Sequence, residues 1–346
     1  MGFSEILKDN RKKVDSEIKR FLPEKLDEKW LVKHIGAACY DIKAVNEFFS
    51  RPVWDFLERG GKRWRPLLMF LACGAVGGNP KAIVKFAVIP ELIHNGSLVA
   101  DDIEDSSLTR RNKPSIHVTY GMDVAVNLSS CMYYLPMLII KDSRLGAERK
   151  VRIYELINEE MTRLHFGQGT DIYWHKAKNE KVSESHYFSM CAYKTGTLAR
   201  LSAKLGAILG KGAEKQISAL GKFAEAIGVA FQIQDDVLNL IGGVGKDFGE
   251  DITEGKMSLP VIRTLSAASK RDKKLLLGIL KKHSKDKQEI TMASKIINHY
   301  QSLEYSGNVA DKIVRKAWSD LEPLLAPSVS KDGLKQLARF VLERKH

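Results

Sequence analysis

The sequence predicts an all-α protein, and three observations lead to this prediction. Apolar residues recur at helical spacing along most of the 346 residues. No run of β-branched residues shows the strict alternation, bounded by turn residues, that is typical of a strand. Glycine-rich stretches at 77–80, 210–212 and 242–245 fall between periodic segments, as expected of helix ends. There is no Gly/Ser/Pro-rich linker and no repeat, so we expect one domain over residues 1–346.

Within this domain we expect three groups of helices. N-terminal helices occupy residues 1–58, a core that carries the chemical motifs spans about 58–260, and C-terminal helices fill 261–346. Periodicity predicts the individual helices, in order, at 14–21, 44–58, 64–76, 81–108, 125–140, 148–164, 185–209, 217–240, 259–265, 273–281, 292–300 and in the segments from 308 on.

Composition limits the functional classes. The chain is 44% hydrophobic and 28% charged, which is ordinary for a soluble protein. No apolar run approaches the roughly 18 residues that span a bilayer, and the first residues lack the apolar stretch of a signal peptide. The four cysteines show no metal-binding spacing. We therefore expect a cytoplasmic protein without stable membrane insertion.

The net charge of +13 is compatible with nucleic acid, an anionic membrane surface or a small anionic substrate. Much of the excess lies at 270–287, where lysines alternate with an apolar helical stripe, and a solvated helix face is the ordinary explanation. No motif with interleaved aromatic residues accompanies it, so we expect no nucleic-acid partner.

The helix predicted at 217–240 carries a polar stripe on an otherwise apolar segment. Four polar residues stand at i, i+3, i+4 and i+7, and so share one face: Gln232, Asp235, Asp236 and Asn239. An apolar helix is expected to be buried, and a buried carboxylate costs several kcal/mol unless it is paired or binds a metal. The pattern indicates a functional site, although a face that merely meets water is the alternative.

The segment LVADDIEDSSLTRR, residues 98–111, repeats this pattern. His94, Ser97, Asp101 and Asp105 form one stripe among apolar residues, and the two aspartates, four apart, can face one cation. Carboxylate oxygens suit Mg²⁺, and no Cys or His set for zinc lies nearby. Glu104 is expected to face away.

Basic residues accompany both acidic stripes. GGKRWRP, residues 60–66, places Lys62, Arg63 and Arg65 between a glycine pair and a proline at the start of an apolar helix, where phosphate binds well. A charged loop without a ligand is the alternative. The other basic or polar candidates are Arg110 and Arg111 after the first stripe, Lys194 and Thr195 before Gly196, and Lys246 and Lys256 after the second stripe.

Together these motifs resemble the trans-isoprenyl diphosphate synthases, the family of farnesyl and geranylgeranyl diphosphate synthases. The family's first motif, DDxxD, matches 101–105, and its second matches 235–239 inside FQIQDD. GGKRxRP, the arginine pair, Lys-Thr-Gly, GQxxD at 167–171 and the loop ending at Lys256 follow in family order over about residues 58–260. Asn239 stands where many members have a third aspartate, and Trp64 where a smaller apolar residue is usual.

The resemblance implies a helical bundle of the isoprenoid synthase type around a central cavity, as a homodimer. The implied reaction is the head-to-tail, trans condensation of isopentenyl diphosphate with an allylic diphosphate. Isopentenyl diphosphate would be bound by Lys62, Arg65, His94 and Arg111. The allylic diphosphate would be bound by Arg110, Lys194, Thr195, Gln232, Lys246 and Lys256. Of these, Lys194, Thr195 and Gln232 would be catalytic, and three Mg²⁺ ions, with Mn²⁺ as an alternative, would be held by Asp101, Asp105 and Asp235.

In the family, side chains one turn before the first motif form the floor of the elongation pocket. Here Gly96 and Ser97 stand five and four residues before Asp101, and their small size predicts geranylgeranyl diphosphate or a longer product. Close helix packing is the alternative role for Gly96. Bulk from the following helix, at Met122 or at Tyr133 and Tyr134, could still close the pocket.

Four rival functions remain at this point. One is a farnesyl diphosphate synthase. A class I terpene cyclase shares the metal chemistry but needs no isopentenyl diphosphate site, and a non-catalytic regulatory homologue would be expected to lose one acidic motif. Nucleic-acid binding would require the basic surface to be the function.

Overall fold

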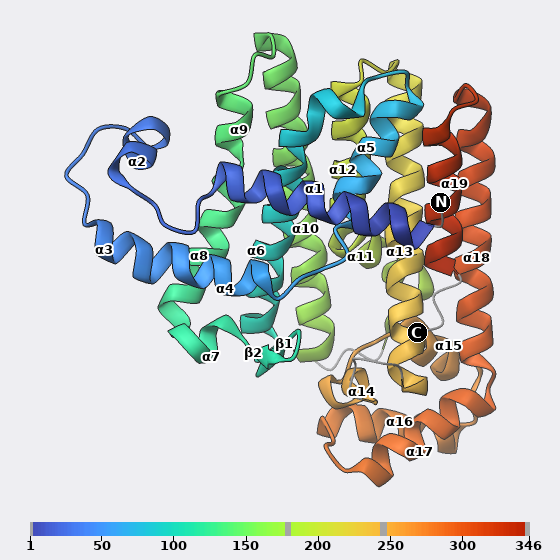
Figure 1. The fold of residues 1–346 in the computed structure, drawn as a ribbon. Helices are drawn as coiled ribbons and strands as arrows, with labels where there is room; N and C mark the ends of the chain where they lie inside the picture. Colours follow the sequence, from blue (N-terminus) through green and yellow to red (C-terminus); the bar gives the residue numbers. More distant parts are fainter. Residues whose placement is uncertain (1–2, 177–180, 243–247, 343–346) are drawn as a thin grey trace.

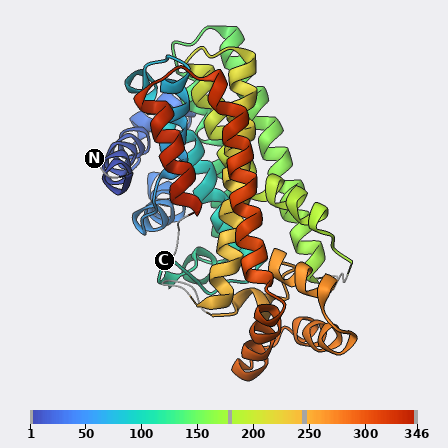
Figure 2. The ribbon, with the colours of Figure 1, turned by 90° about the vertical axis from the view of Figure 1, so that its right-hand side faces the viewer.

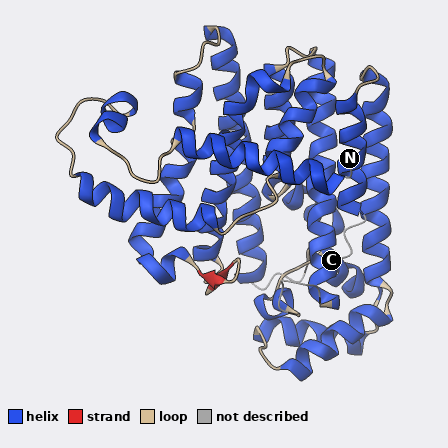
Figure 3. Cartoon of the chain, in the orientation of Figure 1, coloured by secondary structure: helices blue, strands red, loops and turns tan. Residues whose placement is uncertain are grey.

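The computed structural model describes residues 3–176, 181–242 and 248–342. Helices dominate it (Figure 3), and the described residues contain one sheet, a hairpin of two two-residue strands. Long helices stand side by side as a bundle, and a cluster of short helices lies at one end (Figure 1). The prediction of an all-α fold is confirmed.

The N-terminal helices wrap the outside of the bundle. Helix α1 (Phe3–Phe21) lies across the long helices and contacts α5, α6 and α19 (Figure 1). The helix expected at 44–58 runs as three joined segments that include a π-turn, because Pro52 has no N–H for the regular ladder. The elements after α1 are α2 (Glu28–His34), α3 (Ile42–Val45), η1 (Asn46–Ser50) and α4 (Arg51–Glu58).

The middle of the bundle is helix α12 (Gly196–Leu209). Every one of its residues except Lys204 is buried, and it packs mainly on α13 and α5. A mostly apolar helix is expected at such a central position, and its buried Arg200 is paired with Glu160 and Glu225. It contacts α5 (Trp64–Ala75), α6 (Val88–Glu104), α10 (Ala147–Lys176), α11 (Glu184–Lys194) and α13 (Glu214–Ile241). The other elements of this part of the chain are η2 (Pro80–Ala87), α7 (Ile116–Tyr120), α8 (Met122–Tyr134) and α9 (Met137–Lys141).

The single helix expected at 185–209 is broken into α11 and α12 at Thr195. Two glycines let α13 approach this break: a Cβ on Gly228 would lie only 2.6 Å from the Cα of Gly196. Gln232 stands one turn after Gly228, so the close approach brings it beside Thr195. The break therefore positions part of the site.

A hairpin follows α6, although the sequence predicted no strand. Strands β1 (Thr109–Arg110) and β2 (Lys113–Pro114) pair with Arg110 opposite Lys113. Arg111 and Asn112 form the two-residue turn, and both have positive φ, 56° and 62°, as a type I′ turn requires. Such short strands leave no periodicity to detect in the sequence.

The C-terminal helices complete the bundle and form the cluster at its end. Figure 2 shows α18 and α19 side by side on one face, where both pack on α13. Helices α14, α16 and α17 lie at the lower end in Figure 1. The bounds are α14 (Glu250–Glu254), α15 (Leu259–Ala267), α16 (Lys270–Lys282), α17 (Lys287–His299), α18 (Ser302–Leu321), η3 (Glu322–Leu324) and α19 (Val329–Leu342).

Two helical segments are long and apolar enough to cross a membrane by length and composition alone, Pro80–Glu104 and Met122–Lys141. They are 67% and 50% buried inside the protein, as core helices of a folded domain are. The first of them carries Asp101 and Asp102, which fits a helix inside a protein better than one in lipid.

Candidate active site

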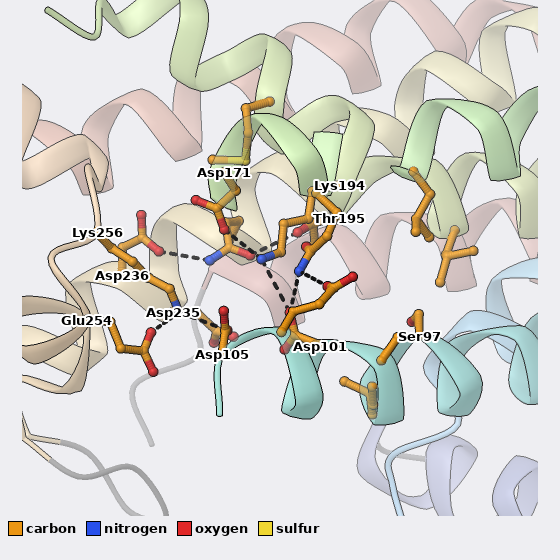
Figure 4. A pocket seen from close by; sticks show the side chains of 18 of the residues that line it. Ser97, Asp101, Asp105, Asp171, Lys194, Thr195, Asp235, Asp236, Glu254 and Lys256 are labelled. Atoms are coloured by element: carbon orange, nitrogen blue, oxygen red, sulfur yellow. Dashed lines mark hydrogen bonds and ion pairs between the residues drawn. The ribbon is translucent and has the colours of Figure 1, made fainter. Parts of the chain in front are cut away.

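A cavity of about 300 Å³ opens between the two acidic stripes. Asp101 and Asp105 reach it from α6, and Asp235 reaches it from α13 (Figure 4). The two stripes therefore face each other across one space. The other predicted site residues that line it are Arg65, His94, Ser97, Arg110, Lys194, Thr195, Gln232 and Lys256.

Lys194 neutralises one side of the cavity. Its Nζ donates to Asp171 Oδ2 at 2.7 Å and lies 3.4 Å from Asp101 Oδ1. Burial lowers the pKa of this amine, but Asp171 and Asp101 raise the pKa by more, so it lies above its usual value. Lys194 is thus a fixed cation at the first acidic stripe.

Lys256 occupies the opposite side, in the loop after α14. It pairs closely with Glu254, and its Nζ lies 3.8 Å from Asp105 and 3.9 Å from Asp251. Burial lowers its pKa, yet Asp251 and Glu254 raise it well above the usual value. Burial and the charge of Asp101 raise the pKa of Asp105 to about 6, so this carboxylate lacks full compensation.

A chain of hydrogen bonds crosses the floor between α11 and α13. Thr195 Oγ1 donates to Gln232 Oε1 at 2.9 Å, and Gln232 Nε2 donates to Asp236 Oδ1 at 2.9 Å. Tyr187 donates to the other Asp236 oxygen at 2.7 Å. This chain fixes the orientation of the Gln232 amide and of Thr195. Sequence reasoning missed Tyr187, because nothing in the surrounding sequence distinguishes it from an ordinary core tyrosine.

Arg65 and His94 lie together at one end of the cavity. Arg65 is buried, and its Nε has no hydrogen-bond partner among the described residues. Burial and Arg111 lower its pKa to about 10, although Glu91 opposes this. Burial and the nearby Arg65 also hold the pKa of His94 well below its usual value, so His94 is neutral. A buried guanidinium N–H without a partner can donate a hydrogen bond to a bound anion.

Two other members of the predicted isopentenyl diphosphate set stand outside the cavity lining. Lys62 is exposed, and its Nζ lies 5.5 Å from the ring centre of Phe340 on α19. Arg111 lies on the hairpin turn and donates to the carbonyl of Gly60. Their roles stay predictions. Lys246 lies outside the described residues.

The hairpin also carries Arg110, which lines the cavity. Its guanidinium donates through Nε to Asp102 Oδ1 at 2.6 Å and through Nη2 to Asp101 Oδ2 at 3.3 Å. Asp102 is buried and faces this arginine. The second aspartate of the first motif thus orients a cavity cation.

The expectation that Glu104 faces away is wrong. Glu104 lines the cavity, and Gln168 on α10 donates to its Oε2 at 2.6 Å and to Asp101 Oδ1 at 3.1 Å. Helical spacing puts Glu104 off the Asp101 stripe, but α10 lies close enough for Gln168 to bridge both residues. Gln168 and Asp171 belong to the GQxxD motif, which was the sequence signal for this wall.

The predicted floor residues separate in the structure. Ser97 lines the cavity, whereas Gly96 is buried against α8, where a Cβ would lie 2.9 Å from Met132 Cβ and 3.0 Å from the Ser129 carbonyl oxygen. Close helix packing, the alternative for Gly96, is the role that the structure supports. On α8, Tyr133 lines the cavity, while Met122 and Tyr134 are exposed and do not close it.

The three cavity aspartates suit a divalent metal ion whose remaining ligands are water and phosphate oxygens. Among the described residues no group of three or more His, Cys, Asp or Glu side chains is arranged to hold a metal. Mg²⁺ needs no such cage, because it retains water and is held by one or two carboxylates together with phosphate oxygens. Asp101, Asp105 and Asp235 supply oxygen donors from two walls of one cavity, which suits that mode.

Comparison with known proteins identifies the family. A family profile described as "Polyprenyl synthetase" matches residues 46–297. A "Short chain isoprenyl diphosphate synthase" of Methanothermobacter thermautotrophicus is 35% identical over 87% of this chain and 91% of the relative. A "Geranylgeranyl diphosphate synthase" of Methanosarcina mazei is 31% identical over 90% of this chain and 95% of the relative.

Structural comparison agrees with the sequence comparison. The crystal structure of a geranylgeranyl pyrophosphate synthetase from Pyrococcus horikoshii superposes with a TM-score of 0.86 and 31% identity, covering 99% of this chain and 98% of the other. The matched family region contains both acidic stripes and every basic residue that lines the cavity. The chain therefore belongs to the polyprenyl synthetase family, a family of prenyltransferases built on this all-α fold.

Proposed function

We propose that this chain condenses isopentenyl diphosphate with an allylic diphosphate, head to tail and in trans geometry, with Mg²⁺ as the metal. One observation carries the proposal: two carboxylate stripes face each other across a cavity that also holds Arg65 and His94. Metal ions bound by the stripes, together with Lys194 and Lys256, would neutralise a diphosphate that leaves as an anion. Arg65 and His94 suit a second diphosphate beside it.

In this proposal the allylic diphosphate lies between the stripes. Three Mg²⁺ ions, held by Asp101, Asp105 and Asp235, would neutralise the leaving diphosphate, and Mn²⁺ could take their place. Arg110, Lys194 and Lys256 add fixed positive charge at the same place. Lys246, which lies outside the described residues, would be a further ligand of this diphosphate. Thr195 and Gln232 direct oxygen atoms toward the carbon that becomes cationic. The isopentenyl double bond, placed by Arg65 and His94 with Lys62 and Arg111, then attacks that carbon after its bond to the diphosphate has broken. The cation that results loses a proton to the released diphosphate, which restores a double bond in the product.

The product is proposed to be geranylgeranyl diphosphate or longer. Ser97 offers little bulk directly before the first motif, so the tail can pass it. Tyr133 of α8 and His165 of α10 also line the cavity and meet edge to face, with ring centres 5.7 Å apart. This pair is the bulk that stops growth. Ser97→Phe should shorten the product, and Tyr133→Ala should lengthen it by at least one five-carbon unit.

We also propose that the enzyme is a homodimer. On α10, Val151, Tyr154, Phe166 and Tyr173 are all exposed, and helical spacing places them on one face. Exposed polar residues such as Glu155, Asn158 and Thr162 lie among them on the same face, and four large apolar side chains exposed on one helix favour association with a second copy. Light scattering should give a dimer mass, and Phe166→Glu should reduce it, whereas Leu324→Glu on another exposed site should not.

One incubation tests the reaction. Purified protein is mixed with Mg²⁺, labelled isopentenyl diphosphate and each allylic diphosphate in turn, and the products are sized by chromatography. Condensation with an allylic starter is expected. Incorporation that stops at fifteen carbons would identify a farnesyl diphosphate synthase. A cyclic hydrocarbon without isopentenyl incorporation would indicate a terpene cyclase, and no turnover with any starter would contradict the proposal.

A further inference from the structure

We propose that helix α1 positions the isopentenyl diphosphate site through a chain of paired side chains, Asp15, Arg63, Glu91, Asn95 and Arg111, of which the middle three are buried. The inference rests on the proposed function, because it assigns the arginine-rich end of the cavity to isopentenyl diphosphate. It makes Asp15, Arg63, Glu91 and Asn95 positioning residues and leaves substrate contact to their neighbours.

Arg63 stands between Lys62 and Arg65 in the sequence but is not available to a substrate. Its side chain is only 2% exposed, and every guanidinium nitrogen already donates inside the protein. Nε donates to Asp15 Oδ1 at 2.9 Å, Nη1 to Glu91 Oε1 at 2.5 Å, and Nη2 to the carbonyl of Leu57 at 3.1 Å. The motif thus contains one arginine that holds structure.

Helix α1 also holds the main chain of this loop. Arg63 adopts the left-handed conformation, with φ 51° and ψ 34°, which is unfavourable for a non-glycine residue. The Asn10 amide on α1 donates to the Arg63 carbonyl at 2.8 Å. α1 therefore contacts Arg63 at both its side chain and its backbone, and the strained conformation is held from outside the loop. Arg65 follows two residues later, at the start of α5.

From Glu91 the chain continues to the hairpin turn. Glu91 Oε1 also accepts from Asn95 Nδ2 at 2.9 Å, and Asn95 Oδ1 accepts from Arg111 Nη1 at 3.3 Å. Glu91 and Asn95 are both buried. The amide of Asn95 can therefore face only one way, with its oxygen toward Arg111. This fixes the guanidinium of Arg111 relative to α6.

Charge explains why the chain is needed. Arg63 and Arg111 approach the same backbone: a Cβ on Gly61 would lie 3.1 Å from Arg63 Nη1 and 3.4 Å from Arg111 Nη2. Two buried guanidinium groups this close repel each other unless a carboxylate lies between them. Glu91 supplies that carboxylate and Asp15 adds a second, so the arginines keep their places before any diphosphate binds.

Two variants and one matched control test the inference. Asp15→Asn removes the charge that α1 contributes, and Asn95→Ala removes the last link without touching Arg63. Asp9→Asn makes the same chemical change as Asp15→Asn at an exposed position of α1. For each purified protein, thermal melting is recorded, and the KM of each substrate is measured with the other at saturation.

We expect both variants to raise the KM for isopentenyl diphosphate about tenfold, equivalent to about 1.4 kcal/mol, while the KM for the allylic diphosphate changes less than twofold. Asp9→Asn should match the wild type. A merely structural role would lower the melting temperature and affect both substrates in parallel, and this result, like an unchanged KM for both, would overturn the inference. If Asp15→Asn does not fold, Asn95→Ala alone decides. A wild type that condenses nothing refutes the proposed function instead.

Discussion

Gly96→Ala separates the packing role of residue 96 from the role in product length that its sequence position indicates. The added methyl group would lie 2.9 Å from Met132 Cβ and 3.0 Å from the Ser129 carbonyl oxygen. Carbon atoms in contact are normally about 3.5–4.0 Å apart, so α6 and α8 must move apart by roughly 0.6–1 Å. Overpacking of this kind costs about 1–3 kcal/mol, and alanine recovers about 1 kcal/mol of helix propensity. We expect a net destabilisation of up to about 2 kcal/mol.

The assay is urea unfolding, followed by product analysis under conditions where the variant is folded. Gly307→Ala on α18 is the control, because a Cβ there meets nothing within 4 Å and only the propensity gain remains. The control should be more stable than the wild type, by up to about 1 kcal/mol. Product length should be unchanged in both variants, because the methyl group added at residue 96 would lie 3.3 Å from Tyr133 Cε1 and needs only a few tenths of an ångström from that ring. A shorter product from folded Gly96→Ala, or a stability gain equal to that of Gly307→Ala, would refute this account of the α6–α8 contact.

Three further predictions concern the cavity. Asp101→Ala should reduce the condensation rate about 10²–10³-fold, measured by incorporation of labelled isopentenyl diphosphate, and full activity would exclude its role. Asp105→Asn should stabilise the metal-free protein at pH 7 by up to about 3 kcal/mol, because the pKa of Asp105 is raised to about 6 and its native carboxyl loses stability as pH rises through pH 4–6. With EDTA present, the difference in unfolding free energy between Asp105→Asn and the wild type should vanish below pH 4. A difference that does not change with pH would contradict this prediction. Tyr187→Phe should cost about 1–3 kcal/mol of unfolding free energy, because buried Asp236 loses a donor, and an unchanged denaturation midpoint would be inconsistent with that bond.

Sequence periodicity predicted the fold class and the faces of the two acidic helices. Asp101, Asp105 and Asp235 line one cavity because a polar stripe on an apolar helix has to face another polar surface. Periodicity describes one helix at a time, however, and does not say which neighbour lies in front of a given face. Glu104 illustrates this limit, since only the position of α10 and Gln168 brings it into the cavity wall.

The prediction of product length shows the same limit of sequence periodicity. Gly96 and Ser97 are adjacent in sequence, yet they point to α8 and to the cavity respectively. A rotation of 100° between consecutive helical residues is enough to give them different roles. The same holds for the GGKRWRP segment, where composition could not distinguish Arg63, used entirely inside the protein, from Arg65, whose Nε is left without a partner.

Lys194 and Lys256 are the counter-ions of the first acidic stripe, and this has a consequence for the order of binding. Each ammonium group already occupies the neighbourhood of a carboxylate that a metal would use, Asp101 for Lys194 and Asp105 for Lys256. A bare divalent ion must compete with these amines, whereas a metal that arrives with diphosphate offers them phosphate oxygens in exchange. We therefore expect the resting enzyme to have little affinity for free Mg²⁺ and to take up metal and allylic substrate together. As a consequence, the metal site that promotes ionisation of the allylic diphosphate forms only when this substrate is bound.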